Sequence, residues 1–249
     1  MSRGYVKTRR VKRSTAARIR PFWILIAFFG ALALLGLVYL AMWPGFNLKR
    51  VTVSGNQRVS TDEILARAEI PTNRSIWFEN TRAIADRIRA IPYVDSVSVG
   101  RIPPASLTVW VTERVPFAIL QSGATQAIVD HAMRVLSPAS GDERLPVFIL
   151  PNLDLTPGRF VTAPDALALR ESYTTLAGNG VFPASLAFDR FGGLVATTPS
   201  GLRILFGERN DLGHKVRLLQ AILAQVVRRQ RSVAAIDLRA PGTPVVVYR

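Results

Sequence analysis

The chain has 249 residues, with 32 lysines and arginines against 17 aspartates and glutamates, two histidines and no cysteine. A hydrophobic content of 49% excludes a wholly disordered chain, and the length allows one or two ordinary domains. The lack of cysteine excludes disulfides, a thiolate nucleophile and cysteine-based zinc or iron–sulfur sites.

Positive charge is concentrated at the N-terminus. Residues 1–20 contain eight basic side chains and no acidic one, which is more than half of the formal net charge of +15. Such a tail is typical of nucleic-acid-binding arms and of the cytoplasmic flanks of membrane anchors. The apolar run that follows favours the second interpretation.

Residues 22–43 form an apolar run of 22 residues without a charge or a proline. As a helix it would be roughly 33 Å long, which matches the hydrocarbon core of a bilayer. Ala31-Leu32-Ala33 has the pattern of a signal-peptidase site, but the apolar run continues ten residues beyond it. We therefore expect an uncleaved signal anchor over 21–43, a basic cytoplasmic tail over 1–20, and export of the chain from about residue 44 onward.

The next segment begins with signals for a strand and two helices. Val51-Thr52-Val53 predicts a short strand. In Ser60-Thr61-Asp62-Glu63 we expect a capping box, in which the Ser60 hydroxyl accepts from the amide of Glu63 and Glu63 reaches back. The helix that it opens should end before Pro71. A second helix should begin at Asn80 or Thr81 and end at Pro92, with one apolar stripe of three isoleucines: Ile84, Ile88 and Ile91.

Two alternating strands follow these helices. Val97 and Val99 alternate with serines, and Leu107, Val109 and Val111 alternate with Thr108, Trp110 and Thr112. The order strand, helix, helix, strand, strand predicts a module of about 70 residues, in which two helices cover one face of a three-stranded sheet.

Residues 117–249 predict a mostly antiparallel β domain with a long helix near its end. A hairpin is expected around Ser122-Gly123, a helix from Thr162 to Gly178 and an amphipathic helix over 215–231. In that last helix we expect five inward side chains: Val216, Leu219, Leu223, Val226 and Val227. Further strands are expected over 146–150, 186–188, 194–198, 202–206, 233–238 and 244–248. The fold class is therefore α+β.

The order of these motifs resembles a known family. The runs Val51 to Asn56, Ser60 to Ile64, Ile91 to Val94 and Val111 to Ala118, with V-x-E-R-x-P-x-A in the last, are similar to a POTRA domain of the FtsQ/DivIB family of bacterial division proteins. The resemblance is strongest over 46–118 and looser over 119–249. It implies a POTRA-like domain at 46–116, a β domain at 117–249 and a non-catalytic role in division.

The residues offer little for catalysis. Asp130 and His131 are adjacent, and adjacent side chains of a strand point to opposite faces. His214 is expected at the start of a helix, and Glu63, Glu113 and Asp237 at surface or capping positions. Gly192-Gly193 indicates a turn and not a phosphate loop. We expect no catalytic residue, no metal site, no cofactor, no small-molecule substrate and no nucleic-acid partner.

The C-terminal segment Pro244 to Tyr248 is the candidate for binding. If it is an edge strand, a partner segment could extend the sheet there; it could equally be an ordinary member of the sheet. The resemblance implies that FtsB, paired with FtsL, binds along the last strands, and that two arginines, Arg190 and Arg239, contact an acidic position of FtsB. The implied site consists of Arg190, Arg239, Ala240, Gly242, Val245, Val246, Val247 and Tyr248.

We therefore expect a single-pass inner-membrane scaffold with most of its chain in the periplasm, concentrated at the division septum. It would recruit septal division proteins and connect them, through FtsB and FtsL, to septal peptidoglycan synthesis. A membrane-anchored POTRA chaperone for exported proteins is the alternative, and an anchored exported enzyme is the other rival. Against the chaperone stands the single POTRA-like unit, which no barrel-length run of strands follows.

Overall fold

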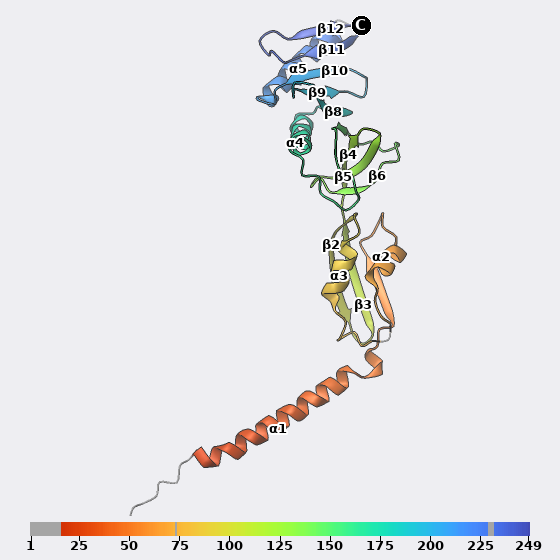
Figure 1. Cartoon of the computed structure of the whole chain (residues 1–249), viewed down its shortest axis with the longest axis vertical. Coiled ribbons are helices and arrows are strands. Elements are labelled where there is room, and N and C mark those ends of the chain that lie inside the picture. Colours follow the sequence, from red (N-terminus) through yellow and green to blue (C-terminus); the bar gives the residue numbers. More distant parts are fainter. Residues whose placement is uncertain (1–15, 73, 229–231) are drawn as a thin grey trace, which may run out of the picture. The chain divides into compact units, whose positions relative to one another are not determined.

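The computed structural model describes residues 16–72, 74–228 and 232–249. It begins with the helix α1 (Ala16–Ala41), followed by a single 3-10 turn, η1 (Pro44–Phe46) (Figure 1). Among the described residues, Phe22–Ala41 is the one helical stretch long and apolar enough to cross a membrane. The helix predicted for the apolar run is therefore present, and its end at Ala41 precedes the Pro44-Gly45 pair. Most of the basic tail lies outside the described residues.

The following elements appear in the predicted order. The three strands form one sheet with the order β1-β3-β2. Ser60 caps α2 by accepting a hydrogen bond from the amide of Glu63 at 3.1 Å, which confirms this half of the capping box. The elements are β1 (Arg50–Ser54), α2 (Thr61–Ala68), α3 (Thr81–Arg89), β2 (Val94–Ile102) and β3 (Ser106–Glu113).

The apolar patterns that predicted these elements mark their buried faces. Ile84 and Ile88 of α3 are buried, and Ile91, just beyond the end of the helix, is buried as well. Leu107, Val109 and Val111 are the buried residues of the β3 alternation, although Thr108 between them is also buried. The apolar period of 3.6 residues in the helix and of 2 residues in the strand thus identified the side chains that become buried.

The remaining strands form one nine-stranded sheet with the order β12-β11-β10-β9-β8-β7-β4-β5-β6. Five of its eight strand pairs are antiparallel and three are parallel, so the expectation of a mostly antiparallel sheet is confirmed. Its strands are β4 (Pro116–Ser122), β5 (Thr125–Asp130), β6 (Val135–Pro138), β7 (Val147–Ile149), β8 (Ser185–Phe188), β9 (Leu194–Thr197), β10 (Arg203–Gly207), β11 (Val233–Asp237) and β12 (Val245–Tyr248).

Two helices, α4 (Pro164–Gly178) and α5 (Leu212–Arg228), contribute to the same hydrophobic core as this sheet. Leu169 and Leu176 of α4 and Val216 and Leu219 of α5 are fully buried in it. The expected inward position of Val227 was wrong, because its side chain is 75% exposed. The buried residues of α5 lie in its first half, so the amphipathic pattern continues beyond the part of the helix that the core covers. Residues 229–231 lie outside the described residues.

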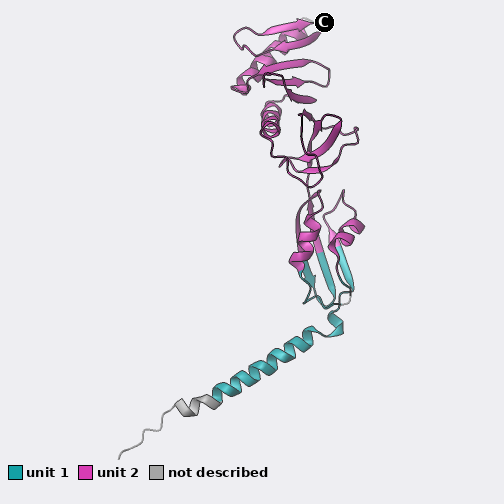
Figure 2. Cartoon of the chain, viewed as in Figure 1, with its two compact units in different colours: residues 1–52, 71–80, 100–108 teal, residues 53–70, 81–99, 109–249 magenta. Residues whose placement is uncertain are grey.

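Backbone contacts divide the chain into two compact units, which Figure 2 colours separately. One unit comprises residues 1–52, 71–80 and 100–108, and the other comprises 53–70, 81–99 and 109–249. These units are not the domains 46–116 and 117–249 expected from the sequence, whose boundary stays a prediction.

Glu113, in the most distinctive sequence motif, ties a loop to the end of β3. Its carboxylate accepts hydrogen bonds from the backbone amides of Gln57, Arg58 and Val59 at 2.8–3.0 Å. Burial raises the pKa of Glu113, but the bonds from these three amides outweigh burial and lower the pKa below its ordinary value. We expected this carboxylate at a surface or capping position; in the structure it is half-buried and binds the amides of a loop that precedes the first turn of α2.

We expect Glu113→Gln to lower the free energy of unfolding by about 1–2 kcal/mol near neutral pH, because a neutral amide accepts these bonds less strongly. The folded pKa lies below the unfolded value of about 4.3, so the stabilisation is complete above that value and is lost as pH falls through the folded pKa. Thermal unfolding of Glu113→Gln and of the natural chain, from neutral pH down through the folded pKa of Glu113, measures the difference in stability. The exposed Glu171→Gln is the control, and a difference between Glu113→Gln and the natural chain that did not shrink in acid would contradict the assignment.

Candidate interaction surface

The strand β12 is the last strand of the nine-stranded sheet, so the edge position required by the sequence hypothesis is present. It pairs with β11 on one side only, with Val246 opposite Ile236 and Val245 opposite Asp237. None of its four residues is buried. Three of the four are valines, which favour extended backbone, so β12 is an apolar strand whose two faces both remain accessible.

The direction of one backbone bond fixes which groups of β12 point outward. Ser232 directly precedes β11, and its carbonyl accepts a hydrogen bond from the amide of Arg249 at 3.0 Å. Because successive residues of a strand turn their amide and carbonyl groups to opposite sides, Val247 and Val245 also face β11. The N–H and C=O of Val246 therefore face away from the sheet.

The strand at the opposite edge of the sheet, β6, is covered on its outer side, whereas β12 is not covered by any described strand. The amide of Val135 in β6 donates to the carbonyl of Arg159, and the amide of Gly158 donates to the carbonyl of Val135, both at 2.8 Å. Loop 158–159 thus occupies the outer side of β6. Among the described strands none lies beyond β12, so the two edges of this sheet differ in their capacity to accept another strand.

Arg239 follows β11 and is held by a carboxylate two residues before it. Its Nε donates to both oxygens of Asp237 at 3.0 Å, and its Nη2 donates to Oδ2 at 2.6 Å. The side-chain hydrogen bond from Arg239 lowers the pKa of Asp237 despite the opposing effect of burial, and the same bond raises the pKa of Arg239. The side chain of Arg239 is half exposed, so its orientation is fixed while the donors not used by Asp237 remain available.

Arg190 lies in the turn between β8 and β9, exposed, with its guanidinium 4.6 Å from the ring centre of Phe191. The neighbouring Asp189 accepts hydrogen bonds from the amides of Phe191 and Gly193, both at 2.8 Å. The amide bonds from Gly193 and Phe191 lower the pKa of Asp189, and the charges of Arg239 and Arg190 lower it further. The structure therefore brings both predicted arginines near one carboxylate, although 48 residues separate them in the sequence.

The other predicted residues lie in the connection between β11 and β12. The amide of Thr243 donates to the carbonyl of Ala240 at 3.0 Å, which closes a turn. Ala240 and Gly242 are exposed, and a side-chain carbon placed on Gly242 would meet nothing within 4 Å. These two residues therefore contribute accessible backbone between Arg239 and β12.

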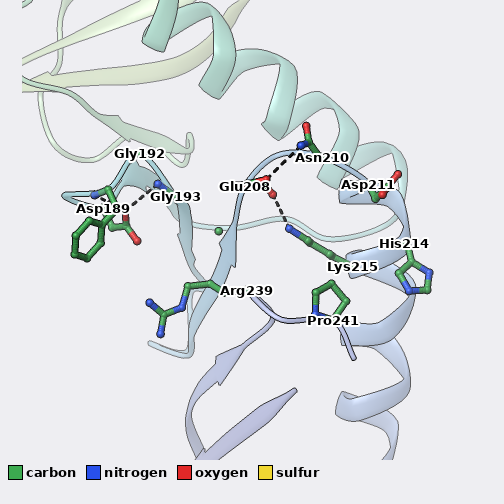
Figure 3. A pocket seen from close by; sticks show the side chains of 12 residues that line it. Asp189, Gly192, Gly193, Glu208, Asn210, Asp211, His214, Lys215, Arg239 and Pro241 are labelled. Carbon is green, nitrogen blue, oxygen red and sulfur yellow. Dashed lines mark hydrogen bonds between the residues drawn. The ribbon is translucent and has the colours of Figure 1, made fainter. Parts of the chain in front are cut away.

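A cavity of about 630 Å³ borders Arg239, and the sequence did not predict it. Figure 3 shows Asp189, Gly192 and Arg239 on one side of the cavity and His214 and Lys215, from α5, on the other. Lys215 is buried and donates to the carbonyls of Phe206 and Glu208 at 2.8 and 2.6 Å, so its charge is used to hold the chain between β10 and α5. The Gly192-Gly193 pair and Gly207 line this cavity, and these glycines are the sequence features that could have indicated it.

Gly207 allows Arg239 to approach β10 closely. Its φ of +67° lies in the region that favours glycine, and a Cβ built there would lie 2.9 Å from Cγ of Arg239 and 3.3 Å from its Cα. Any other residue would push against Arg239. The position of the arginine thus depends on a glycine 32 residues earlier in the chain.

The two histidines do not join this surface as a reactive pair. His214 is exposed at the start of α5, and the His131 ring lies 4.9 Å from that of Phe117 in an edge-to-face contact. No group of three or more His, Asp or Glu side chains in the described parts of the chain could hold a metal ion. This surface has an open strand edge and, at the start of the turn between β11 and β12, the half-exposed guanidinium of Arg239. Such a surface suits an extended segment with an acidic side chain.

Comparison with known proteins identifies a family model for the part of the chain in which the sequence motifs are strongest. The family model of the FtsQ-type POTRA domain matches residues 46–114. A cell division protein FtsQ of Bradyrhizobium diazoefficiens is 27% identical over 203 residues, a match that covers 81% of this chain and 57% of the Bradyrhizobium protein. FtsQ of Syntrophotalea carbinolica is 26% identical over 94% of this chain and 86% of its own length. FtsQ of Chloroflexus aurantiacus is 22% identical over 98% of this chain and 93% of its own length.

Proposed function

We propose that this chain, which belongs to the FtsQ/DivIB family of cell division proteins, is a non-catalytic scaffold of the bacterial division machinery. It would recruit septal division proteins at the inner membrane and link them, through FtsB and FtsL, to septal peptidoglycan synthesis. The curated relatives are named as cell division proteins, which supports the division role. The specific partners are part of the proposal.

In this proposal α1 crosses the inner membrane once. The basic residues that precede it keep the N-terminus in the cytoplasm, and the remainder of the chain lies in the periplasm and gathers at the septum. The apolar length from Phe22 to Ala41 suits one crossing. The protein would act by binding, with no turnover and no cofactor.

The observation that carries the proposed mechanism is the open edge of β12. An extended segment of FtsB could pair with the outward N–H and C=O of Val246, and its side chains could pack on Val245 and Val247, which are exposed. Arg239 and Arg190 would receive an acidic side chain of that segment. Arg239 is already oriented by Asp237, which reduces the entropy that binding must overcome.

We expect Arg239→Glu to weaken binding of FtsB by about tenfold to hundredfold, because it removes the guanidinium and places a carboxylate near Asp237 and Asp189. Titration of the full chain in nanodiscs with the exported FtsB–FtsL segments measures the effect. Arg144→Glu is the matched control, since it makes the same charge change at an exposed site in the loop after β6. Equal affinities of the two variants would remove Arg239 from the site.

The division role itself is tested in the native bacterium by depleting the protein while a fluorescent copy, fused at residue 1, is supplied. Filamentous cells that are rescued by a fusion gathered at mid-cell are the expected result. Normal cell length with a uniformly distributed fusion would contradict the proposal and favour a membrane-anchored chaperone for exported proteins.

A further inference from the structure

The loop over residues 74–80 is attached to the end of the apolar helix. The Ser75 hydroxyl donates to the carbonyl of Ala41 at 2.7 Å, and Ala41 is the last residue both of α1 and of the candidate span. A carbonyl at the C-terminal end of a helix lacks an intrahelical donor, so Ser75 satisfies a group that would otherwise need water or a lipid headgroup. If α1 spans the bilayer, this bond places Ser75 at the membrane surface.

Aromatic rings connect the helix end with the same loop. The ring centres of Trp43 and Phe46 are 6.0 Å apart, and those of Phe46 and Trp77 are 6.1 Å apart, both in edge-to-face geometry. Trp77 and its neighbour Phe78 are nevertheless 46% and 47% exposed. Two large exposed aromatic side chains therefore lie within three residues of the bond to Ala41, which is unusual for a surface that faces only water.

The position of the loop is held by Arg101. Its Nε donates to the carbonyl of Ile76 at 2.7 Å and its Nη2 donates to that of Glu79 at 2.6 Å, on either side of the aromatic pair. These bonds fix the backbone from which Trp77 and Phe78 project. Arg101 therefore holds the loop in the conformation that exposes the two rings.

Charge in this part of the chain is mostly positive. Within residues 42–52, 71–80 and 100–108 the sequence contains four basic residues and one acidic residue, Glu79. Glu79 is buried, with its Oε1 3.8 Å from Nε of Arg74, whereas Lys49, Arg50 and Arg74 are exposed. Exposed tryptophan together with basic side chains is the composition that favours the interface between lipid tails and headgroups, above all where the lipids are anionic.

We propose that the loop 74–80 docks on the outer surface of the lipid bilayer, with Trp77 and Phe78 in the headgroup layer. The proposal rests on α1 spanning the membrane, as proposed above. The headgroup layer is roughly 5–8 Å thick on each side. Two residues of extended chain cover at most about 7 Å, so Trp77 lies within reach of this layer from Ser75. The occupant of the exposed aromatic surface is therefore the membrane itself, and this contact would supplement the anchor provided by α1.

Tryptophan fluorescence tests the proposal in the full chain, because the sequence has four tryptophans and two of them form a matched pair. Trp77 and Trp110 are 46% and 48% exposed and lie in different compact units. One protein carries Trp23→Phe, Trp43→Phe and Trp110→Phe and keeps only Trp77. The other carries Trp23→Phe, Trp43→Phe and Trp77→Phe and keeps only Trp110. Both are placed in nanodiscs that contain lipids brominated near the headgroup end of the acyl chains.

We expect the brominated lipids to quench Trp77 about twofold more strongly than Trp110, because only Trp77 would lie at the interface. Equal, weak quenching of the two would overturn the proposal and leave a protein partner as the occupant of the aromatic surface. A third protein that keeps only Trp23 separates this failure from a failure of the membrane span. Quenching of Trp23 with none of Trp77 rejects the docking alone, whereas no quenching of Trp23 rejects the span and the docking together.

Discussion

Val246→Pro is expected to weaken binding of the FtsB segment to this protein by about tenfold to hundredfold. Proline removes the N–H that points away from β11, and its ring occupies the space where a partner backbone would approach. The pairing between β11 and β12 uses the groups of Val245 and Val247, so it should persist. Calorimetric titration of the full chain in nanodiscs with the exported FtsB–FtsL segments measures the change.

Val246→Ala is the matched control for this substitution. It removes side-chain volume at the same position but keeps the outward N–H, so the affinity should fall by only about threefold or less. If alanine weakened binding as much as proline, the side chain and not the backbone would carry the contact. If neither substitution had an effect, the partner would not pair with β12.

Arg114→Ala is expected to lower the free energy of unfolding by about 3–5 kcal/mol. The side chain of Arg114 is 12% exposed, and its guanidinium lies 2.6 Å from Oδ2 of Asp130 and 2.9 Å from Oδ1 of Asp95. Asp130 is itself buried, so removal of the arginine leaves a buried carboxylate without its ion-pair partner, although the amide of Arg134 still donates to its Oδ1. Thermal or chemical unfolding of the full chain in detergent measures the loss.

Arg159→Ala provides the control for the effect of burial. Arg159 also lies 2.6 Å from a carboxylate oxygen, that of Asp154, but the two side chains are 70% and 53% exposed. An exposed pair contributes about 1 kcal/mol or less, because water solvates both charges when the pair is broken. Similar losses for the two variants would contradict the assigned role of Arg114.

The sequence predicted those parts of the fold that depend on local patterns. The Ser60 cap, the alternation around Leu107 to Val111 and the stripe of Ile84 and Ile88 all reflect periods that are visible in the chain itself. The strand β6 was missed, because Val135 to Pro138 is short and ends in a proline, and its outer edge is completed by a loop more than 20 residues later. Val227 was misplaced because periodicity identifies the apolar face of a helix but not the point where the core ends.

The candidate site was only partly accessible to such reasoning. The final strand could be recognised from its valines, whereas its edge position depends on the order of nine strands. The pairing of Arg114 with Asp95 and Asp130 joins residues that are distant in sequence, and so does the approach of Arg239 to Gly207. Contacts of this kind follow from topology, which a single sequence does not encode as a local pattern.

The most direct measurement of the proposed mechanism is hydrogen exchange of two neighbouring amides in β12, in the full chain with and without saturating FtsB–FtsL segments. The amide of Val247 faces β11 and should be protected in both states, whereas that of Val246 faces outward and should become protected only when the partner binds. An unchanged exchange rate at Val246 in the saturated complex would contradict strand addition at β12.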